Sequence, residues 1–424
     1  MIILSKAVRF SFPFILLLSS LVGCAPGFLG VASTATFTET VTPTAVPPTA
    51  TPIPSTQTLT PTATVVPSST PVPVFISATV WSADPQVPIL AYHRFYPDSL
   101  LAVSNSTKTR LSDFQQQLQT LYDSGYSLVP LDAWLKGDMR IPAGRKPLIL
   151  TIDDCFFADQ IFLNPDGTPS VKSGVGLLWQ FSQTHPDFGF AVALFYNMGD
   201  KQYGNVVRGD WWNVGPGWED SLAKAIAWCI QNGAMPYNHF YTHPELDLIT
   251  TVKDLNYQLQ ENEIQLRDSL TRINQQSLAD NLANIIAITF GIWPTNESVK
   301  KALLSYVSTN NQPLLAIMDV DYAIRAKYLQ PVYSTQFNRF DVPRIVANQD
   351  GIDVLVKNKD TFPKAQDCKL GPVDTTKVED PAYLAQLITD MSNNKTCPDG
   401  VYSMAAGLFR LQDGQVTAIP VLVK

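Results

Sequence analysis

The stretch Leu148-Ile149-Leu150-Thr151-Ile152-Asp153-Asp154 decides the fold of this chain. Its apolar and β-branched residues predict a short buried strand, and two carboxylates follow at the point where that strand ends. In parallel α/β folds the functional groups gather at the carboxyl ends of the strands, which makes the two aspartates a candidate site. Two aspartates after a strand can also be a helix cap or a loop charge, so this pair alone leaves both interpretations open.

Strand and helix patterns alternate on both sides of this stretch. Apolar runs predict further strands at 87–92, 189–196, 285–290 and 313–318. Apolar residues at helical spacing predict helices at 111–124, 175–184, 221–232 and 249–270, and Gly233 is expected to end the third of these. Such alternation predicts a parallel sheet or a barrel.

A second group of polar residues lies in Asn238-His239-Phe240-Tyr241-Thr242-His243-Pro244. This segment holds two of the four histidines of the chain, four residues apart. One carboxylate with two imidazoles is a common open metal site that leaves room for water and substrate. Histidines beside aromatic residues can also be ordinary surface residues, but the concentration of half of them in one short segment favours metal binding.

Three motifs together resemble the polysaccharide deacetylases of carbohydrate esterase family four. Thr151 to Asp154 is similar to their first motif, usually written TFDDG, and Asn238 to Pro244 is similar to their second. Val87 to Phe95 resembles the amino-terminal YH motif of the circularly permuted members, which include the biofilm poly-N-acetylglucosamine deacetylases. No histidine follows His243, in agreement with the permuted order.

The resemblance covers about residues 85–346, and its last segment is Val342-Pro343-Arg344-Ile345. It implies a fold of the α/β class, a distorted (β/α) barrel of about seven strands, where a complete barrel has eight. We therefore expect a deacetylase-like domain at 79–358 and a C-terminal extension at 359–424. In the extension, a helix is predicted at 381–393, before a strand-rich stretch, and the whole is expected to pack on the barrel.

The resemblance also implies a role for each motif residue. Asp154, His239 and His243 would bind a divalent metal, with Zn²⁺ as the first choice and Co²⁺ or Ni²⁺ as alternatives. Asp153 would be the general base, and His93 would be the general acid. Such a site hydrolyses an acetamide with a metal-activated water. The implied activity is that of a polysaccharide N-deacetylase acting on an N-acetylhexosamine polymer.

Two departures from the family pattern bear on activity. Cys155 stands where the family usually has glycine, and its side chain would either crowd the pocket or shift the following turn. The third motif is present only as Phe290-Gly291-Ile292-Trp293-Pro294, without its arginine. Arg344 is the candidate to orient the base instead, because that role requires a bidentate guanidinium. The aromatic segment Trp211 to Trp218 would either stack on sugar rings or pack on the barrel.

The first residues predict export. Lys6 and Arg9 precede an apolar run at 10–22, which is too short for a comfortable transmembrane span. Gly23-Cys24 resembles the lipobox of bacterial lipoproteins, so 1–23 would be the signal peptide and Cys24 the lipidated residue. An ordinary secretory signal with a chance cysteine is the alternative. We expect a lipid anchor on the outer face of the cell membrane or in the outer membrane.

The anchor residue would be followed by a disordered linker at 24–78. Between about residues 32 and 74 the chain consists almost wholly of Thr, Pro, Ser, Ala and Val, with Glu39 as the single charge. Such a composition cannot bury a core, and its prolines favour extended conformations. The linker is therefore expected to act as a semi-rigid spacer between membrane and domain.

The remaining cysteines fit an oxidising compartment. Cys368 and Cys397 flank a short polar segment, and we expect them to form a disulfide. Cys155 and Cys229 are expected to be buried thiols.

The formal net charge of −7 argues against nucleic acid as a partner, because proteins that bind phosphates normally present a basic surface. The expected partners are an N-acetylated polysaccharide and the membrane, and the chain is expected to be a monomer. Three hypotheses stay open: an active N-deacetylase, an inactive relative that only recognises glycan, and a structural surface lipoprotein with coincidental motifs.

Overall fold

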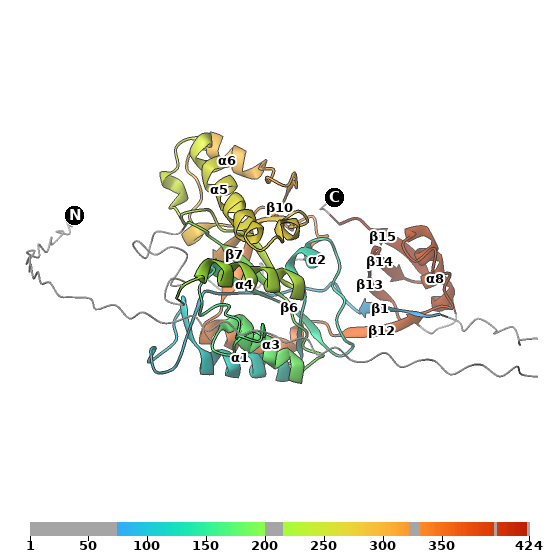
Figure 1. The fold of residues 1–424 in the computed structure, drawn as a ribbon. Coiled ribbons are helices and arrows are strands. Elements are labelled where there is room, and N and C mark those ends of the chain that lie inside the picture. The colour runs from blue at the N-terminus through green and yellow to red at the C-terminus, as the bar shows by residue number, and fades with distance from the viewer. Residues whose placement is uncertain (1–73, 200–214, 322–330, 394–396, 422–424) are drawn as a thin grey trace, which may run out of the picture. The chain divides into compact units, whose positions relative to one another are not determined.

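A computed structural model describes residues 74–199, 215–321, 331–393 and 397–421 (Figure 1). Several features predicted from the sequence lie outside the described residues. They are the signal peptide, Cys24, nearly all of the linker, and the tryptophans at 211 and 212. In the part of the chain that is described, no helix combines the length and the apolar character needed to cross a bilayer.

Seven parallel strands of the described chain close into a ring. They follow one another around the ring in chain order: β2 (Ile89–Tyr92), β6 (Lys146–Cys155), β7 (Val192–Tyr196), β8 (Ala234–Asn238), β9 (Asn284–Ala287), β10 (Leu314–Asp321) and β11 (Val342–Val346). β11 pairs with β2, and β2 pairs with β6, which completes the closure. A further strand, β5 (Tyr126–Leu128), pairs with the beginning of β6. The predicted distorted (β/α) barrel of about seven strands is confirmed.

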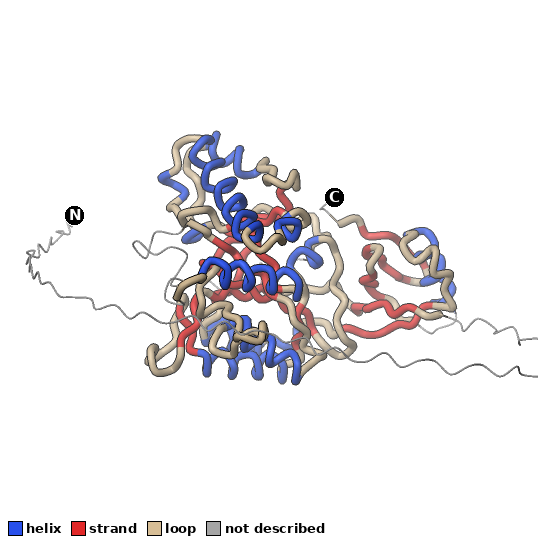
Figure 2. Tube along the Cα trace, viewed as in Figure 1, coloured by secondary structure: helices blue, strands red, loops and turns tan. Residues whose placement is uncertain are grey.

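Helices lie outside the barrel strands (Figure 2). They are α1 (Leu111–Asp123), α2 (Leu131–Leu135), α3 (Gly174–Thr184), α4 (Trp218–Asn232), α5 (Val252–Thr271), α6 (Glu297–Leu304) and α7 (Gln349–Lys357). Side chains cap several of them: Ser173 accepts from the third residue of α3, and Thr251 accepts from Asp254 of α5. Gly233, with φ of 92°, ends α4 as predicted. Two short strands, β3 (Arg94–Tyr96) and β4 (Lys108–Arg110), pair with each other beyond the end of β2.

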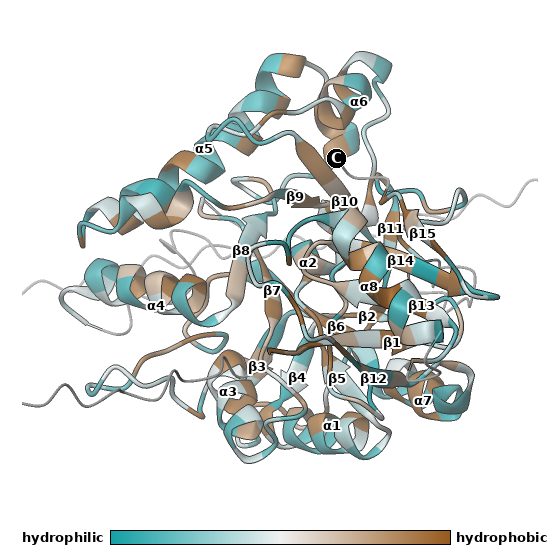
Figure 3. Ribbon diagram, turned by 90° about the vertical axis from the view of Figure 1, so that its right-hand side faces the viewer, coloured by the Kyte–Doolittle hydropathy of each residue, from teal (hydrophilic) through white to brown (hydrophobic). Residues whose placement is uncertain are grey.

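The hydrophobic core has an inner and an outer part. Every residue of β6 except Asp154 is buried, as expected for a parallel strand covered on both faces. Alternate strand residues such as Ile149 and Phe195 belong to the cluster inside the barrel, whereas Leu150 and Leu194 pack with the helices outside. Figure 3 shows largely hydrophobic strands in the barrel and wide hydrophilic stretches along α5.

A second, antiparallel sheet is built from both ends of the described chain. Its order is β12 (Ala365–Leu370), β1 (Ile76–Trp81), β13 (Gly400–Met404), β14 (Gly407–Gln412) and β15 (Gln415–Ile419). α8 (Pro381–Asn393) packs on it with a separate hydrophobic cluster. β1, which begins just before the predicted deacetylase-like domain, therefore lies between two strands of the predicted C-terminal extension.

This sheet contacts the barrel domain through both polar and apolar groups. The Met139 N–H donates to Ser403 Oγ at 2.8 Å, and the Gly144 N–H donates to the Ala365 carbonyl at 2.8 Å. Trp81 and Val401 share a hydrophobic cluster with the strands inside the barrel. The disulfide between Cys368 and Cys397 lies within the sheet's own cluster.

Candidate metal and catalytic site

The structure brings the predicted site residues together at the carboxyl ends of the barrel strands. Asp153 and Asp154 lie at the end of β6, His239 and His243 follow β8, and His93 directly follows β2. His93 Nε2 lies 4.0 Å from Asp153 Oδ2, and His243 Nε2 lies 3.1 Å from Asp154 Oδ1. Residues that are more than a hundred positions apart in the chain therefore share one end of the barrel.

A backbone irregularity lets both aspartates face this end. Successive residues of a regular strand point to opposite sides, so two adjacent carboxylates would diverge. Between Ile152 and Cys155 the pairing of β6 with β7 shifts, and Asp154 has a positive φ of 59°. Such irregularities re-aim side chains and are frequent next to functional sites.

Asp154, His239 and His243 form a group suited to a cation. One donor atom from each residue can be chosen so that all three lie within 4.8 Å of one another. His239 is 2% exposed and His243 is 8% exposed. Asp154 Oδ1 is buried and has no hydrogen-bond partner among the described residues, although both imidazoles lie nearby. An unpartnered buried carboxylate oxygen facing two imidazole nitrogens is what a divalent ion would satisfy.

The two histidines are oriented by the backbone and by aromatic neighbours. His239 Nδ1 lies 2.9 Å from the Ala287 carbonyl at the end of β9 and donates to it, which directs Nε2 toward Asp154. The His243 ring packs edge-on against Phe290, with 4.4 Å between ring centroids. Phe240 and His243 both have positive φ, at 61° and 52°, so the connecting loop has a defined and uncommon conformation.

The electrostatics of the group keep its carboxylate ionised. Burial by itself raises the pKa of Asp154, but the neighbouring imidazoles of His239 and His243 outweigh burial and hold this pKa well below its ordinary value. One carboxylate and two imidazoles leave further coordination positions open for water and substrate. The donors present therefore fit a divalent metal ion.

Arg344 holds Asp153 as a bidentate partner. The Arg344 Nη1 donates to Asp153 Oδ1 at 2.6 Å, and Nη2 donates to Oδ2 at 2.8 Å. Both residues are 1% exposed. Nη1 also donates to Thr151 Oγ1, and Nε donates to the Asp319 carbonyl, so the guanidinium is fixed on three sides. Burial raises the pKa of Asp153. The Arg344 guanidinium and the nearby imidazole of His239 lower this pKa by more than burial raises it, so the net shift is downward.

His93 is fixed mainly through its backbone. The Gln160 side chain, which is fully buried, donates to the carbonyls of both His93 and Asp153 at 2.8 Å. The next residue, Arg94, forms a bidentate ion pair with Asp159. The Nδ1 of His93 is buried without a hydrogen-bond partner in the described residues, and Nε2 faces Asp153. These contacts hold the histidine next to the two aspartates.

Gln160 is a site residue that the sequence alone did not single out, and Phe290, named there only as part of the third motif, lies beside a histidine of the site. Phe290 is half exposed, has a positive φ of 56° and lies against His243. The Nε1 of Trp293 donates to Asp319 Oδ2 at 3.0 Å. Gln160 lies in an irregular loop with no periodic pattern, so only its buried position in the structure marks it.

Cys155 does not line an open pocket. Its side chain is fully buried and belongs to the cluster between the barrel strands and the outer helices. Its Sγ donates to the Ile152 carbonyl at 3.4 Å. Burial raises the pKa of the thiol well above its ordinary value, which keeps it neutral. Of the aromatic segment, only residues from Gly215 onward are described, and Trp218 begins α4.

No family model matches this chain, and no curated protein matches it. Solved structures do match. The deacetylase PplD of Streptococcus pyogenes is 17% identical over 64% of this chain and 97% of its own, with a TM-score of 0.39. A polysaccharide deacetylase from Bacillus cereus is 14% identical over 65% of this chain and 69% of its own, with a TM-score of 0.39. A de-N-acetylase from Aggregatibacter actinomycetemcomitans is 11% identical over 63% of this chain and 99% of its own, with a TM-score of 0.38. In structure this chain is thus similar to bacterial deacetylases, polysaccharide deacetylases among them.

Proposed function

We propose that this chain is a metal-dependent N-deacetylase of an N-acetylhexosamine polysaccharide. The observation that carries the proposal is the meeting of three groups at one end of the barrel: a carboxylate with two imidazoles, a second carboxylate clamped by arginine, and a third imidazole. Hydrolysis of an amide needs an activated water, a base for its proton and an acid for the leaving amine. The three groups supply these functions separately.

Asp154, His239 and His243 would hold the ion, with Zn²⁺ as the first candidate. When bound, a divalent ion supplies a water of lowered pKa and polarises the acetamide carbonyl. The remaining chemistry belongs to side chains of the chain itself. Asp153, kept ionised by Arg344, accepts a proton from the water at one carboxylate oxygen.

His93 completes the reaction on the other side of the bond. As an imidazolium it donates the proton on Nε2 to the departing nitrogen. This Nε2 lies 4.0 Å from Oδ2 of Asp153, the carboxylate that serves as the base. The carbon–nitrogen bond of the acetamide breaks, and the water oxygen stays with the acetyl carbon. Acetate and a free amino sugar leave the site, and one water molecule is consumed. The proton taken by Asp153 and the proton given by His93 balance over the cycle.

The direct test is acetate release from N-acetylglucosamine oligomers and from peptidoglycan. The metal should first be removed with a chelator and then restored with Zn²⁺ or Co²⁺. Release that disappears with the chelator and returns with the metal supports the proposal. Stoichiometric metal binding without acetate release from either substrate would instead indicate the inactive, glycan-recognising relative, and absence of metal binding would leave a structural lipoprotein.

We further propose that the chain is exported and held by lipid on Cys24 at the outer face of the cell membrane or in the outer membrane. The support is the sequence of residues 1–24 and the Thr/Pro-rich composition that follows. Labelled fatty acid should be incorporated by the full chain expressed in a bacterium and not by the Cys24→Ala variant. Equal labelling of both would refute the anchor.

A further inference from the structure

The helix α5 presents a group of polar side chains to the loop that carries the metal-binding histidines. Gln258 and Asn262, four residues apart, lie on one face of this helix, and Glu263 directly follows Asn262. None of them takes part in the proposed reaction. Asn262 is fully buried, a position that polar side chains occupy only when their hydrogen bonds are made.

Asn238, the residue before the first histidine ligand, is the centre of these contacts. Its Nδ2 donates to the Leu259 carbonyl at 3.0 Å and to Glu263 Oε1 at 3.1 Å. Its Oδ1 accepts from Asn262 Nδ2 at 2.8 Å and from the Phe240 N–H at 2.9 Å. The amide thus uses both donors and both acceptor sites, and its position is defined on the strand side and on the loop side.

Asn262 links the same group to the end of β7. Its Nδ2 also donates to the Tyr196 carbonyl at 2.6 Å, and its Oδ1 accepts from the Met198 N–H at 2.7 Å. Gln258 holds the second half of the loop. Its backbone carbonyl accepts from the Tyr241 N–H at 2.8 Å, and its side-chain Oε1 accepts from the Thr242 N–H at 2.9 Å. The loop from 238 to 243 is therefore attached to α5 at both ends.

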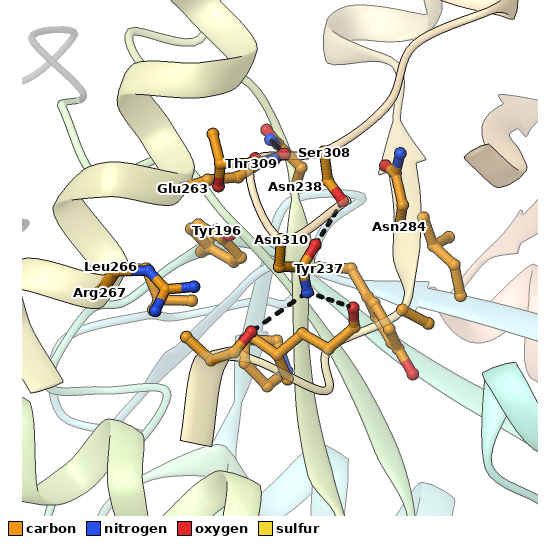
Figure 4. A pocket seen from close by; sticks show the side chains of 15 residues that line it. Tyr196, Tyr237, Asn238, Glu263, Leu266, Arg267, Asn284, Ser308, Thr309 and Asn310 are labelled. Atoms are coloured by element: carbon orange, nitrogen blue, oxygen red, sulfur yellow. Dashed lines mark hydrogen bonds between the residues drawn. The ribbon is translucent and has the colours of Figure 1, made fainter. Parts of the chain in front are cut away.

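Glu263 lies beside a small cavity of about 30 Å³, large enough for about one or two waters (Figure 4). Besides Asn238, the Tyr306 hydroxyl donates to its Oε1 at 3.1 Å, and the Thr309 N–H donates to its Oε2 at 2.7 Å. Figure 4 shows Asn238, Glu263 and Thr309 close together. Burial raises the pKa of Glu263, which these hydrogen bonds partly offset. Because three donors hold the Glu263 carboxylate in partly desolvated surroundings, its position is well defined and it can fix the Asn238 side chain.

We propose that Asn238, Asn262 and Glu263 are positioning residues for the metal site. They are not among the proposed ligands or reacting groups, and they hold the loop so that His239 and His243 direct their Nε2 atoms to Asp154. The inference rests on the proposed metal site but not on the proposed reaction. Two loop residues have positive φ, so the loop would relax toward commoner backbone conformations without these contacts. Partners behind the ligands tune metal affinity by keeping the ligand geometry in place.

The test compares two isosteric changes on the same helix. Glu263→Gln replaces one acceptor oxygen by an amide, so one of its three donors loses its partner. Glu261→Gln is the matched control, because Glu261 accepts from Gln265 at 2.7 Å and does not contact Asn238. Co²⁺ affinity is measured by competition with a chelator, and the Co²⁺ absorption band is recorded at saturating metal. Thermal unfolding of the metal-free proteins is measured alongside.

The proposal expects Glu263→Gln to bind Co²⁺ about tenfold more weakly and with a changed absorption band, and Glu261→Gln to match the wild type. Asn262→Asp, which loses two donated hydrogen bonds, should weaken binding further. Unchanged affinity and band in Glu263→Gln would overturn the proposal, whatever happens to its thermal stability. An equal loss in both glutamine variants would overturn it as well.

Folding of the variants is checked by circular dichroism. If Glu263→Gln does not fold, Tyr306→Phe removes a single donor to the same carboxylate and should give a smaller loss of affinity in the same direction. Unchanged affinity in that variant would then count against the proposal. If the wild type releases acetate and binds metal while the variants bind metal equally well, only the positioning inference fails. If the wild type binds no metal, the proposed metal site fails first.

Discussion

Asp153 and Arg344 form the most constrained pair of residues in the site. Both are nearly inaccessible, and the two hydrogen bonds between them are short. Arg344, from β11, donates to both oxygens of Asp153, which is the bidentate contact expected of it from the sequence. In the proposed reaction the base therefore has an arginine partner, although this arginine lies outside the segment 290–294 that resembles the third motif.

Asp153→Asn should abolish most turnover while the metal remains bound. The substitution keeps the size of the side chain and one acceptor for Arg344, but an amide cannot take a proton from water. General bases contribute about a hundred- to ten-thousand-fold, so kcat should fall by that factor. Metal content by elemental analysis and acetate release measured on the same samples check this. A fall smaller than about tenfold would mean that another group accepts the proton.

His93→Ala should separate amide from ester hydrolysis. His93 faces the base at 4.0 Å and is the general acid for the leaving amine in the proposed reaction. An activated acetyl ester has a leaving group that needs no proton, so its hydrolysis should fall much less than that of the acetamide. Both substrates are assayed with the same metal-loaded variant. Equal falls for amide and ester would rule out His93 as the acid.

Among the elements, the loop after β8 is decisive for the proposed metal site. It contributes both imidazoles, and its backbone and side-chain hydrogen bonds run to α5 and to the ends of β7 and β9. His239→Ala and His243→Ala should each lose most of the bound metal. The barrel should still fold, because the ligands lie beyond the strand ends and not in the hydrophobic clusters. Elemental analysis together with circular dichroism tests both statements, and full metal content in both variants would refute the ligand assignment.

At the opposite end of β6, Lys146 makes the stability of the barrel depend on pH. It is 1% exposed, and its ammonium donates to the Lys359 carbonyl at 2.9 Å. Burial, followed by the charge of Lys364, lowers the pKa of Lys146 to about 8. The unfolded chain keeps a lysine pKa near 10.4, so between pH 8 and about 10.4 the unfolded state binds more protons and stability rises with pH.

Lys146→Met should remove this rise. Relative to the variant, the wild type should gain unfolding free energy between pH 7 and pH 10, because its buried ammonium becomes neutral over that range. Urea unfolding at several pH values measures the difference. The exposed Lys172 provides the control, since Lys172→Met should leave the pH dependence of the wild type intact. A constant difference between wild type and Lys146→Met across the range would contradict the prediction.

At the scale of the whole molecule, the second sheet joins the two ends of the described chain, and the Cys368–Cys397 disulfide closes part of it. The bridge links residues 29 positions apart in a region with a small core. Replacing both cysteines by serine should lower the free energy of unfolding of this sheet by about 2–4 kcal/mol. Metal affinity should not change, because the ligands belong to the barrel. Denaturant unfolding and metal titration of the double variant test the two statements, and a loss of metal affinity would contradict the second.

The sequence predicted much of the barrel but little of what supports its site. Apolar runs located strands such as β6 and β9 to within a few residues, because a strand buried on both faces has an uninterrupted apolar composition. Histidine spacing and the two aspartates located the candidate ligands. Gln160, Asn262 and Glu263 could not be found in this way, because amides and carboxylates in loops and on helices are usually solvated. Only their burial and their partners distinguish them.

What the sequence determined by itself is therefore local: which segments are strands or helices, and which residue types stand at the strand ends. These properties follow from periodicity and side-chain chemistry within a few residues. The tertiary structure alone decided that β1 pairs with β12 and β13, and that Arg344 reaches Asp153 from 191 positions away. Contacts between residues so far apart in the chain depend on the fold of the whole domain. The residue pattern of a single segment does not specify which of several similar strands or side chains it will contact.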